Sequence, residues 1–101
     1  MAKSFNAQVW DLMLKIPKGK VTTYKIIAEK LGTKAYRAVG NACNKNPYAP
    51  RVPCHRVVAS DGTLGGYAHG KRRKVEILGK EGIDIRSNKI DNFNEKVFLY
   101  R

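Results

Sequence analysis

The fold is decided by one stretch of the sequence, Val21-Thr22-Thr23-Tyr24-Lys25-Ile26-Ile27-Ala28-Glu29-Lys30-Leu31-Gly32-Thr33-Lys34. Thr22 or Thr23 can cap a helix over residues 24–31, because a threonine hydroxyl accepts hydrogen bonds from the free N–H groups of a first turn. Gly32 can end this helix in a left-handed conformation. Two short helices with such a tight glycine turn between them are typical of a helix-turn-helix.

The second helix of such a pair is the one presented to DNA. Thr33 is placed to cap this helix, which we expect over about residues 34–44. Its solvent-facing side would carry four polar or basic side chains, namely Lys34, Arg37, Asn41 and Lys45. A purely structural helical hairpin has the same pattern, so both interpretations are open at this point.

Apolar residues at helical spacing predict two further helices. One begins after Ser4, which can cap its first turn, and ends before Pro17. Its inward residues are Phe5, Val9, Leu12, Met13 and Ile16. The other covers residues 71–80 with a basic outer face. Its inward residues are expected to be Val75, Ile77 and Leu78.

Short strands are expected at residues 57–58 and 83–86, each beyond a turn or loop. The fold class is therefore mostly α: a small winged-helix-like helix-turn-helix domain with a few short strands. A chain of 101 residues has room for one small domain with one core.

The charge balance points to a polyanionic partner. Twenty lysine and arginine residues against eight acidic ones give a formal net charge of +12, and no acidic residue falls between Lys30 and Ser60. Self-repulsion makes this excess a cost for the folded state. Nucleic acid is the partner we favour, ahead of an anionic membrane surface or an acidic protein.

No apolar run approaches the roughly 18 residues that cross a bilayer, and residues 1–6 lack the apolar stretch of a signal peptide. We therefore expect a soluble monomer without membrane association. Its expected location is the cytoplasm, or the nucleus in a eukaryote.

The two cysteines have different settings. They lack the paired spacing of a zinc site, and a disulfide framework is not expected in a reducing cell. Cys43 lies among apolar helical positions and is interpreted as a small buried hydrophobic residue. Cys54 follows the proline-stiffened loop 46–53 and precedes His55 and Arg56. Cationic neighbours favour a reactive thiolate, although a structural Cys-His pair also fits this pattern.

The segment Pro53-Cys54-His55-Arg56-Val57, set behind a helix-turn-helix, resembles the active-site motif of the O6-alkylguanine-DNA alkyltransferases. The resemblance covers roughly residues 5–85. It rests on further motifs at matching spacings, namely Lys20-Val21-Thr22-Thr23-Tyr24, Tyr36-Arg37-Ala38-Val39-Gly40-Asn41-Ala42, Lys45-Asn46-Pro47, Gly66-Tyr67 and Glu81-Gly82.

This resemblance implies the domain organisation and the partner. Residues 1–86 would form the DNA-binding alkyltransferase domain, which corresponds to the active-site domain at the C-terminal side of longer members. Residues 87–101 would be a C-terminal extension. Its apolar residues give it something to bury, so we expect it to dock on the same domain. The partner would be double-stranded DNA that contains O6-alkylguanine.

The resemblance also implies how the DNA is bound. A base inside a duplex must be flipped out before a side chain can reach it. Arg37 matches the arginine that fills the vacated stack, and Tyr24 matches the tyrosine that crowds the target phosphate. Thr23, Lys34 and Asn41 are expected to contact the DNA with them.

The implied chemistry is an irreversible transfer of the alkyl group to Cys54, which restores guanine in one single-turnover step. His55, through a water, matches the residue that withdraws the thiol proton, and Glu81 matches the carboxylate that orients it. This is the nucleophile, base and orienter arrangement of covalent catalysis. Asn46 matches the hinge asparagine that braces the turn beside the active loop.

The implied substrate pocket is formed by Tyr67, which would donate toward the base, and by the backbones of Cys54, Val57 and Ala68. Ala68 replaces a serine of the human-type enzyme, and His69 replaces a glycine, which should restrict large alkyl groups. The turn at residues 32–34 is about one residue shorter than the corresponding turn of the human-type enzyme. No metal and no cofactor is expected.

Three other functions are weighed against transfer. Alkyltransferase-like proteins share the single-domain size and bind alkylated guanine without repairing it, but the reactive cysteine is commonly replaced by tryptophan in them. A basic helix-turn-helix regulator with an inert cysteine is the second alternative. A cysteine hydrolase is the third, and only the adjacency of Cys54 and His55 supports it.

Overall fold

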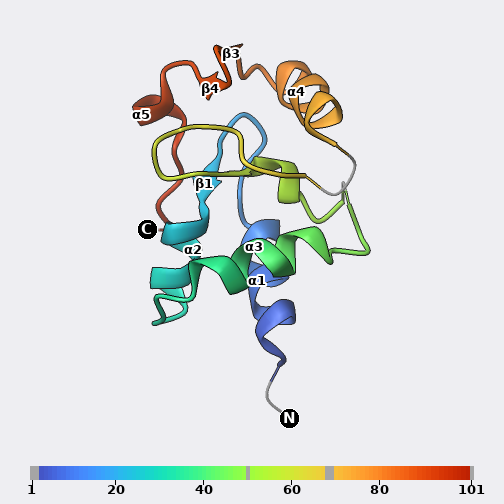
Figure 1. Ribbon diagram of the computed structural model, residues 1–101, viewed down its shortest axis with the longest axis vertical. Coiled ribbons are helices and arrows are strands. Elements are labelled where there is room, and N and C mark those ends of the chain that lie inside the picture. Colours follow the sequence, from blue (N-terminus) through green and yellow to red (C-terminus); the bar gives the residue numbers. More distant parts are fainter. Residues whose placement is uncertain (1–2, 50, 68–69, 101) are drawn as a thin grey trace.

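The computed structural model describes residues 3–49, 51–67 and 70–100. The molecule measures 41 × 25 × 21 Å, and its helices fall into two groups along the long axis (Figure 1). One group contains α1 (Phe5–Leu14), α2 (Tyr24–Lys30) and α3 (Tyr36–Asn44). The other contains α4 (Lys71–Lys80), β3 (Ile85–Arg86), β4 (Lys89–Ile90) and α5 (Phe93–Lys96). Between them lie β1 (Thr22–Thr23), the 3-10 helix η1 (Cys54–Arg56) and β2 (Val57–Val58).

This arrangement confirms a mostly helical fold with a few short strands. Strand β1 pairs in parallel with β2, with Thr22 opposite Val57 and Thr23 opposite Val58. Strands β3 and β4 form an antiparallel hairpin. None of the helices in the described residues is long and apolar enough to cross a membrane.

Helix α1 is capped as the sequence predicts, because the Ala7 N–H donates to Ser4 Oγ at 3.1 Å. The helix ends at Leu14, two residues before the expected limit. The N–H groups of Lys15 and Ile16 bond three residues back, which tightens the last turn before Pro17. Ile16 is nevertheless buried, as its spacing indicates.

The helix-turn-helix is formed by α2 and α3. Thr23 caps α2 by accepting the Ile26 N–H at 3.0 Å, and Gly32 ends the turn at φ +74°. The prediction that Thr33 caps α3 was wrong. Its hydroxyl accepts the Ala35 N–H at 3.2 Å within the turn, and α3 begins only at Tyr36. Lys34 therefore precedes the helix.

The apolar residues form two clusters. The larger one joins α1, α2 and α3 with the segment that carries Cys54, and both α1 and α2 pack against α3. Trp10 adds a hydrogen bond from its indole nitrogen to the Ala42 carbonyl, 2.8 Å long. The smaller cluster joins Val21 and Val58 to Leu64, Leu78, Ile83 and Ile90. The parallel pair β1–β2 thus lies at the boundary of the two clusters.

Helix α4 has the predicted limits but a different inward face. Val75, expected inside, is 38% exposed, whereas Lys74 is fully buried. Leu78 is buried as expected, and Ile77 is half-buried. The helix is therefore rotated from the expected orientation, and a lysine occupies a core position.

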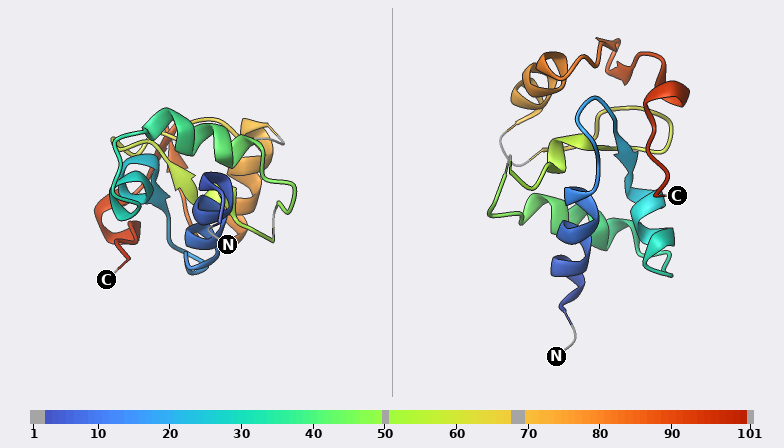
Figure 2. Two further views of the ribbon diagram at one scale, coloured as in Figure 1. Left: turned by 90° about the horizontal axis from the view of Figure 1, so that it is seen from below. Right: turned by 180° about the vertical axis from the view of Figure 1, so that it is seen from behind.

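The chain beyond Arg86 packs against the start of the helix-turn-helix. The Val21 N–H donates to the Lys96 carbonyl at 2.9 Å, and the Phe98 N–H donates to the Val21 carbonyl at 2.6 Å. Tyr100 reaches across to α1, where its hydroxyl donates to the Leu12 carbonyl at 2.6 Å. Figure 2 shows this segment descending from α5 to end near α2. The segment before β1 is thus held from the side opposite to β2.

Candidate active site

Cys54 opens η1 and is only 3% exposed. The loop before it is braced by Asn46, which is itself buried. The Asn46 amide donates to the Val52 carbonyl at 2.7 Å, and its oxygen accepts the Tyr48 N–H at 2.9 Å. The Cys54 N–H donates to the Val52 carbonyl at 2.9 Å. Asn46 therefore fixes the turn that presents the thiol, at the position expected for the hinge residue.

Burial raises the pKa of the Cys54 thiol above its ordinary value. A hydrogen bond from the Asn46 side chain and the charge of Lys74 act in the opposite direction but do not overcome burial. The expectation that the sequence neighbours favour a thiolate is thereby corrected. The Arg56 guanidinium is engaged by Glu81 and by the Ile16 carbonyl. The thiol consequently needs a base to ionise near neutral pH.

His55 is the candidate for that base. Its Nε2 lies 3.2 and 3.1 Å from the two carboxylate oxygens of Glu81, and its Nδ1 is buried without a hydrogen-bond partner among the described residues. Burial lowers the pKa of His55, against the opposing influence of Glu81. The imidazole is therefore neutral near pH 7, and a proton on Nε2 directed at Glu81 leaves the Nδ1 lone pair free to accept another.

Glu81 is held by a second residue, Arg56. The Arg56 guanidinium donates from Nε to Oε1 at 2.9 Å and from Nη2 to Oε2 at 2.5 Å, and Nη1 donates to the Ile16 carbonyl at 2.9 Å. Burial opposes ionisation of Glu81, but the hydrogen bonds and charges of Arg56 and His55 outweigh it and lower the pKa of the carboxyl. Arg56 was not among the catalytic residues predicted from the sequence. The structure shows that it orients the carboxylate that orients His55.

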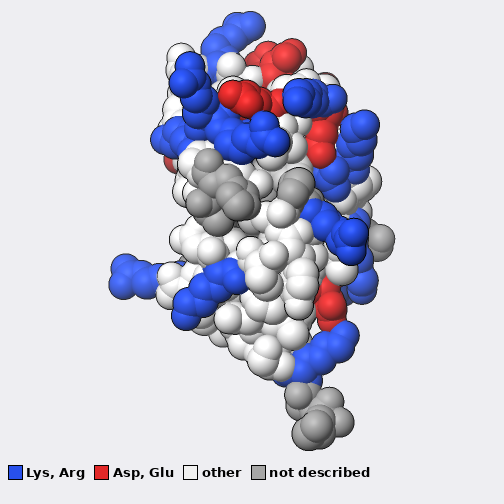
Figure 3. Space-filling view, turned by 90° about the vertical axis from the view of Figure 1, so that its right-hand side faces the viewer, with Lys and Arg blue, Asp and Glu red and all other residues white. Residues whose placement is uncertain are grey.

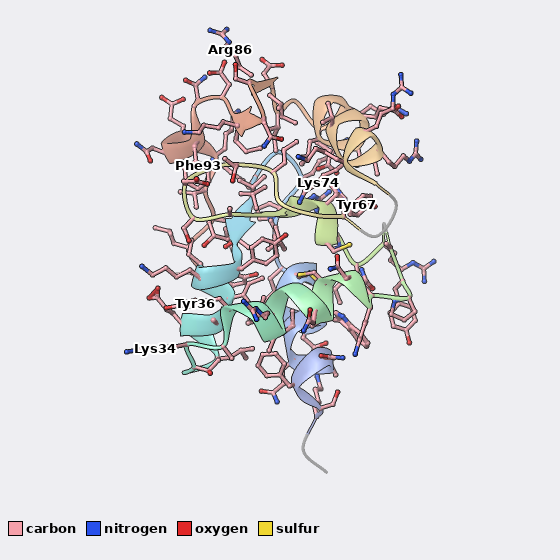
Figure 4. The ribbon with its side chains drawn as sticks, viewed as in Figure 1. Lys34, Tyr36, Tyr67, Lys74, Arg86 and Phe93 are labelled. Carbon is pink, nitrogen blue, oxygen red and sulfur yellow. The ribbon has the colours of Figure 1, made fainter. Side chains whose placement is uncertain are left out.

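Tyr67 lies beside His55, with the ring centroids 6.3 Å apart and the rings nearly perpendicular. Figure 4 shows Tyr67 and Lys74 on the same side of the molecule, close to η1. Val57 begins β2 directly after η1, and it is fully buried. Cys54, His55, Glu81, Asn46, Val57 and Tyr67 are thus gathered around η1. Ala68 and His69 lie outside the described residues.

Tyr24 links the helix-turn-helix to the glycine-rich loop. It is the first residue of α2, and a Cβ atom added to Gly65 would lie 2.9 Å from its hydroxyl oxygen. Gly65 has φ +68°, a conformation that favours glycine. Burial raises the pKa of Tyr24, so its hydroxyl keeps its proton. Tyr24 therefore lies between the proposed DNA-binding face and the loop that leads to Tyr67.

The residues expected to contact DNA separate into two sets. Arg37 and Asn41 are exposed on α3, and Lys34 is exposed in the preceding turn. In Figure 4, Lys34 lies at the far end of α3 from Tyr67. Thr23 is 3% exposed and its side-chain oxygen accepts the Ile26 N–H at the cap of α2, and its contact with DNA stays a prediction.

Figure 3 shows one face on which lysine and arginine side chains gather in the upper half, and others project from the middle and lower parts. Lys71, Arg72 and Arg73 in the first turns of α4 are all exposed. Among the residues that the structure describes, no three His, Cys, Asp or Glu side chains are grouped so that they could hold a metal ion.

Lys74 is a residue of the site that no sequence motif singles out. Its ammonium donates to the carbonyls of Val57, Leu64 and Gly66. The only local signal is its position one helical turn before Leu78 on the same face of α4. A lysine at such a position is ordinarily expected to be exposed.

Residues 4–83 match the family described as 6-O-methylguanine DNA methyltransferase, DNA binding domain. The chain belongs to this family. Among its relatives, a methylated-DNA–protein-cysteine methyltransferase of Candida glabrata is 46% identical over 93 residues, which are 91% of this chain and 44% of the relative. One of Methanosarcina barkeri is 48% identical over 83 residues, 81% of this chain and 52% of the relative. The chain thus spans about half the length of these curated family members.

Solved structures of related proteins are also similar in fold to this chain. The Mycobacterium tuberculosis OGT in complex with DNA has a TM-score of 0.76 and 42% identity over 81% of this chain and 51% of that one. Schizosaccharomyces pombe Atl1 in complex with damaged DNA containing O6-carboxymethylguanine has a TM-score of 0.83 and 32% identity over 97% of this chain and 98% of that one. The likeness to Atl1 therefore takes in the segment beyond Arg86.

Proposed function

We propose that this protein repairs DNA by moving an alkyl group, chiefly methyl, from O6 of guanine onto its own Cys54. The observation that carries the proposal is the arrangement behind the thiol. His55 is neutral and buried, Glu81 holds its Nε2, and its Nδ1 has no protein partner among the described residues. A buried thiol beside such a base is a nucleophile that can be activated on demand.

The proposed reaction is an in-line displacement. His55, through a water, accepts the thiol proton, and Cys54 Sγ forms a bond to the alkyl carbon as the bond from that carbon to O6 breaks. The electron pair of the broken bond stays on the guanine, which takes up a proton and leaves as neutral guanine. The thiol proton has then been exchanged for the alkyl group. Because the thioether is stable, each molecule acts once.

DNA binding is assigned to α3 and the turn before it. Arg37, Asn41 and Lys34 are exposed there, which suits contact with phosphates and groove edges. Arg37 would fill the space of the flipped base, and Tyr24 would press on the target phosphate. Tyr67 and the backbones of Cys54 and Val57 would receive the base, and Ala68 would complete the pocket.

A second candidate is a lesion-binding protein with little transfer activity. The observation in its favour is the likeness to Atl1 over nearly the whole of both chains. The presence of Cys54, with His55 and Glu81 arranged behind it, favours transfer. Domain organisation into a unit of residues 1–86 and a docked extension of residues 87–101 fits either function.

Analysis of the DNA separates the two candidates. An excess of duplex DNA that contains one O6-methylguanine per duplex is incubated with the protein, and the nucleosides are then quantified by chromatography. Transfer predicts that the modified guanine is converted to guanine, with one guanine restored per protein molecule. The Cys54→Ser variant should restore none, while Cys43→Ala serves as the control for loss of a buried thiol.

Unchanged O6-methylguanine together with tight, lesion-selective binding would contradict transfer and support the second candidate. Unchanged O6-methylguanine without any lesion preference would contradict both.

A further inference from the structure

Lys74 is the one lysine or arginine that is buried among the described residues, and its exposed fraction is 0%. Burying an ammonium group is costly unless its charge and its three N–H donors are compensated. The salt bridges of the described residues include no partner for Lys74. The compensation instead comes from backbone carbonyl oxygens. This indicates that Lys74 holds these carbonyl groups in position.

The three acceptors belong to two separate segments. The Val57 carbonyl on β2 lies 2.8 Å from Lys74 Nζ. The Leu64 and Gly66 carbonyls in the glycine-rich loop lie at 2.5 and 3.0 Å. The three donors of the ammonium thus match three acceptors. One segment directly follows η1, and the other directly precedes Tyr67, so Lys74 joins the two walls between which the alkylated base would lie.

We propose that Lys74 is a positioning residue of this site, which fixes the two walls of the lesion pocket and, while it is protonated, places a positive charge near the Cys54 thiol. The pocket's occupant rests on the proposed function. The Val57 carbonyl, whose backbone is expected to contact the guanine edge, has its orientation set by Lys74. Tyr67 follows Gly66 and is positioned through it.

The charge of Lys74 also bears on the nucleophile. It lowers the pKa of Cys54, against the larger effect of burial. The other titratable groups coupled to the thiol, Cys43, Tyr24 and Tyr67, are neutral near pH 7, because burial raises the pKa of each. His55 is neutral as well. Lys74 is therefore, among the described residues, the cation whose charge lowers the pKa of the Cys54 thiol.

The Lys74 ammonium group loses its proton more readily than that of an exposed lysine. Burial lowers its pKa to about 8, with Cys43 and Cys54 acting in the opposite direction and Lys71 adding to the decrease. It is mainly protonated at pH 7 and loses its proton as the pH rises through about 8. Deprotonation removes both the charge and one of the three N–H donors.

The test compares Lys74→Met, Lys74→Arg and the control Lys80→Met in the full chain. Lys80 is an exposed lysine at the end of the same helix, and among the described residues its side chain forms no hydrogen bond or ion pair with the site residues that we name. All variants carry Cys43→Ala, so that Cys54 is the only thiol, and circular dichroism and thermal melting establish that each is folded.

The first readout is the rate of S-alkylation by iodoacetamide across pH, which gives the thiol pKa without any alkylguanine. Lys74→Met should raise the pKa of Cys54 by about one unit, which lowers the rate at neutral pH by about ten-fold. Lys74→Arg keeps the positive charge and should stay near the parent value, as should Lys80→Met.

The second readout is transfer from duplex O6-methylguanine at saturating protein. The limiting rate should fall at least about ten-fold in Lys74→Met and in Lys74→Arg, because a guanidinium cannot reproduce three convergent bonds from one nitrogen. Affinity for the duplex should change by less than about two-fold in both, since α3 is untouched. A purely structural role would lower stability without raising the pKa of the thiol.

A folded Lys74→Met protein with the parent thiol pKa and a limiting rate like that of Lys80→Met overturns the proposal. If Lys74→Met does not fold, Lys74→Arg decides: a loss of limiting rate with an unchanged thiol pKa supports the positioning role, and parent rates overturn it. If the parent protein transfers nothing, the proposed function fails, while the iodoacetamide profiles still decide the role of Lys74.

Discussion

Glu81 lies within 3.2 Å of His55 Nε2 through both of its carboxylate oxygens. Arg56 holds the same carboxylate with two hydrogen bonds, which keep Glu81 oriented toward the imidazole. This contact favours the proton of the neutral imidazole on Nε2, which leaves Nδ1 as the proton acceptor. In the proposed reaction, the activation of the buried Cys54 depends on this chain of contacts.

Glu81→Gln should slow alkyl transfer by about 100-fold, because a neutral amide no longer stabilises the imidazolium that forms as the thiol loses its proton. The limiting single-turnover rate measures this effect. Binding to lesion DNA should be unchanged. Glu76→Gln, on the exposed side of α4, is the matched control. A Glu81→Gln rate within three-fold of the control would show that the carboxylate is only structural.

Stability should depend on the ionisation of His55. Burial lowers its pKa below the ordinary 6.5, so the folded state favours the neutral ring. The stabilisation is fully present above pH 6.5, the value for the unfolded chain, and is lost as the pH falls through the lowered folded value. Glu81 stays ionised in this window, since its own pKa is lowered.

The melting temperature should therefore fall more steeply below pH 6.5 in the parent protein than in His55→Gln. Transfer should slow in the same window, because a protonated His55 cannot take the thiol proton. Parallel melting profiles for the two proteins would be inconsistent with a buried neutral imidazole.

Arg37→Ala should slow repair of duplex DNA about ten-fold or more and leave reaction with free O6-methylguanine base nearly unchanged. A residue that fills the space of a flipped base affects the rate only when the base must first leave a base stack. Arg86→Ala removes an arginine that is 83% exposed at the opposite end of the molecule and serves as the control. Equal slowing with both substrates would argue against a role in flipping.

Gly65→Ala should destabilise the fold by about 2 kcal/mol, because the backbone at φ +68° disfavours a side chain and the new Cβ meets the Tyr24 hydroxyl. Tyr24→Phe should recover part of that loss when combined with it. Gly66→Ala is the matched control, since an added Cβ there has no neighbour within 4 Å. Denaturant unfolding measures each value, and additive effects of the two substitutions would refute the contact.

Local features could be predicted from the sequence because their causes are local. Ser4 and Thr23 cap the helices that follow them, and Gly32 ends α2 with a positive φ. The start of α3 was misplaced because the Thr33 hydroxyl bonds within the turn. Competition between a cap and a turn at such a residue depends on how the helices pack.

The contacts within the site could not be predicted from local sequence signals alone. The pairing of His55 with Glu81, 26 positions apart, was expected only from the family resemblance, because no periodicity brings them together. Lys74 could not be singled out from the sequence, because its acceptors, such as the Val57 carbonyl, come from other parts of the chain. Arg56 was judged by its charge, whereas its role follows from where Glu81 lies.

The most direct test of transfer to Cys54 is the mass of the protein itself. The intact protein is weighed after incubation with duplex DNA containing O6-methylguanine, and the modified peptide is then mapped. The account predicts one added methyl group per molecule in place of one hydrogen, located on Cys54 and absent from Cys54→Ser. An unmodified protein that remains bound to the lesion, or a methyl group on any other residue, would contradict it.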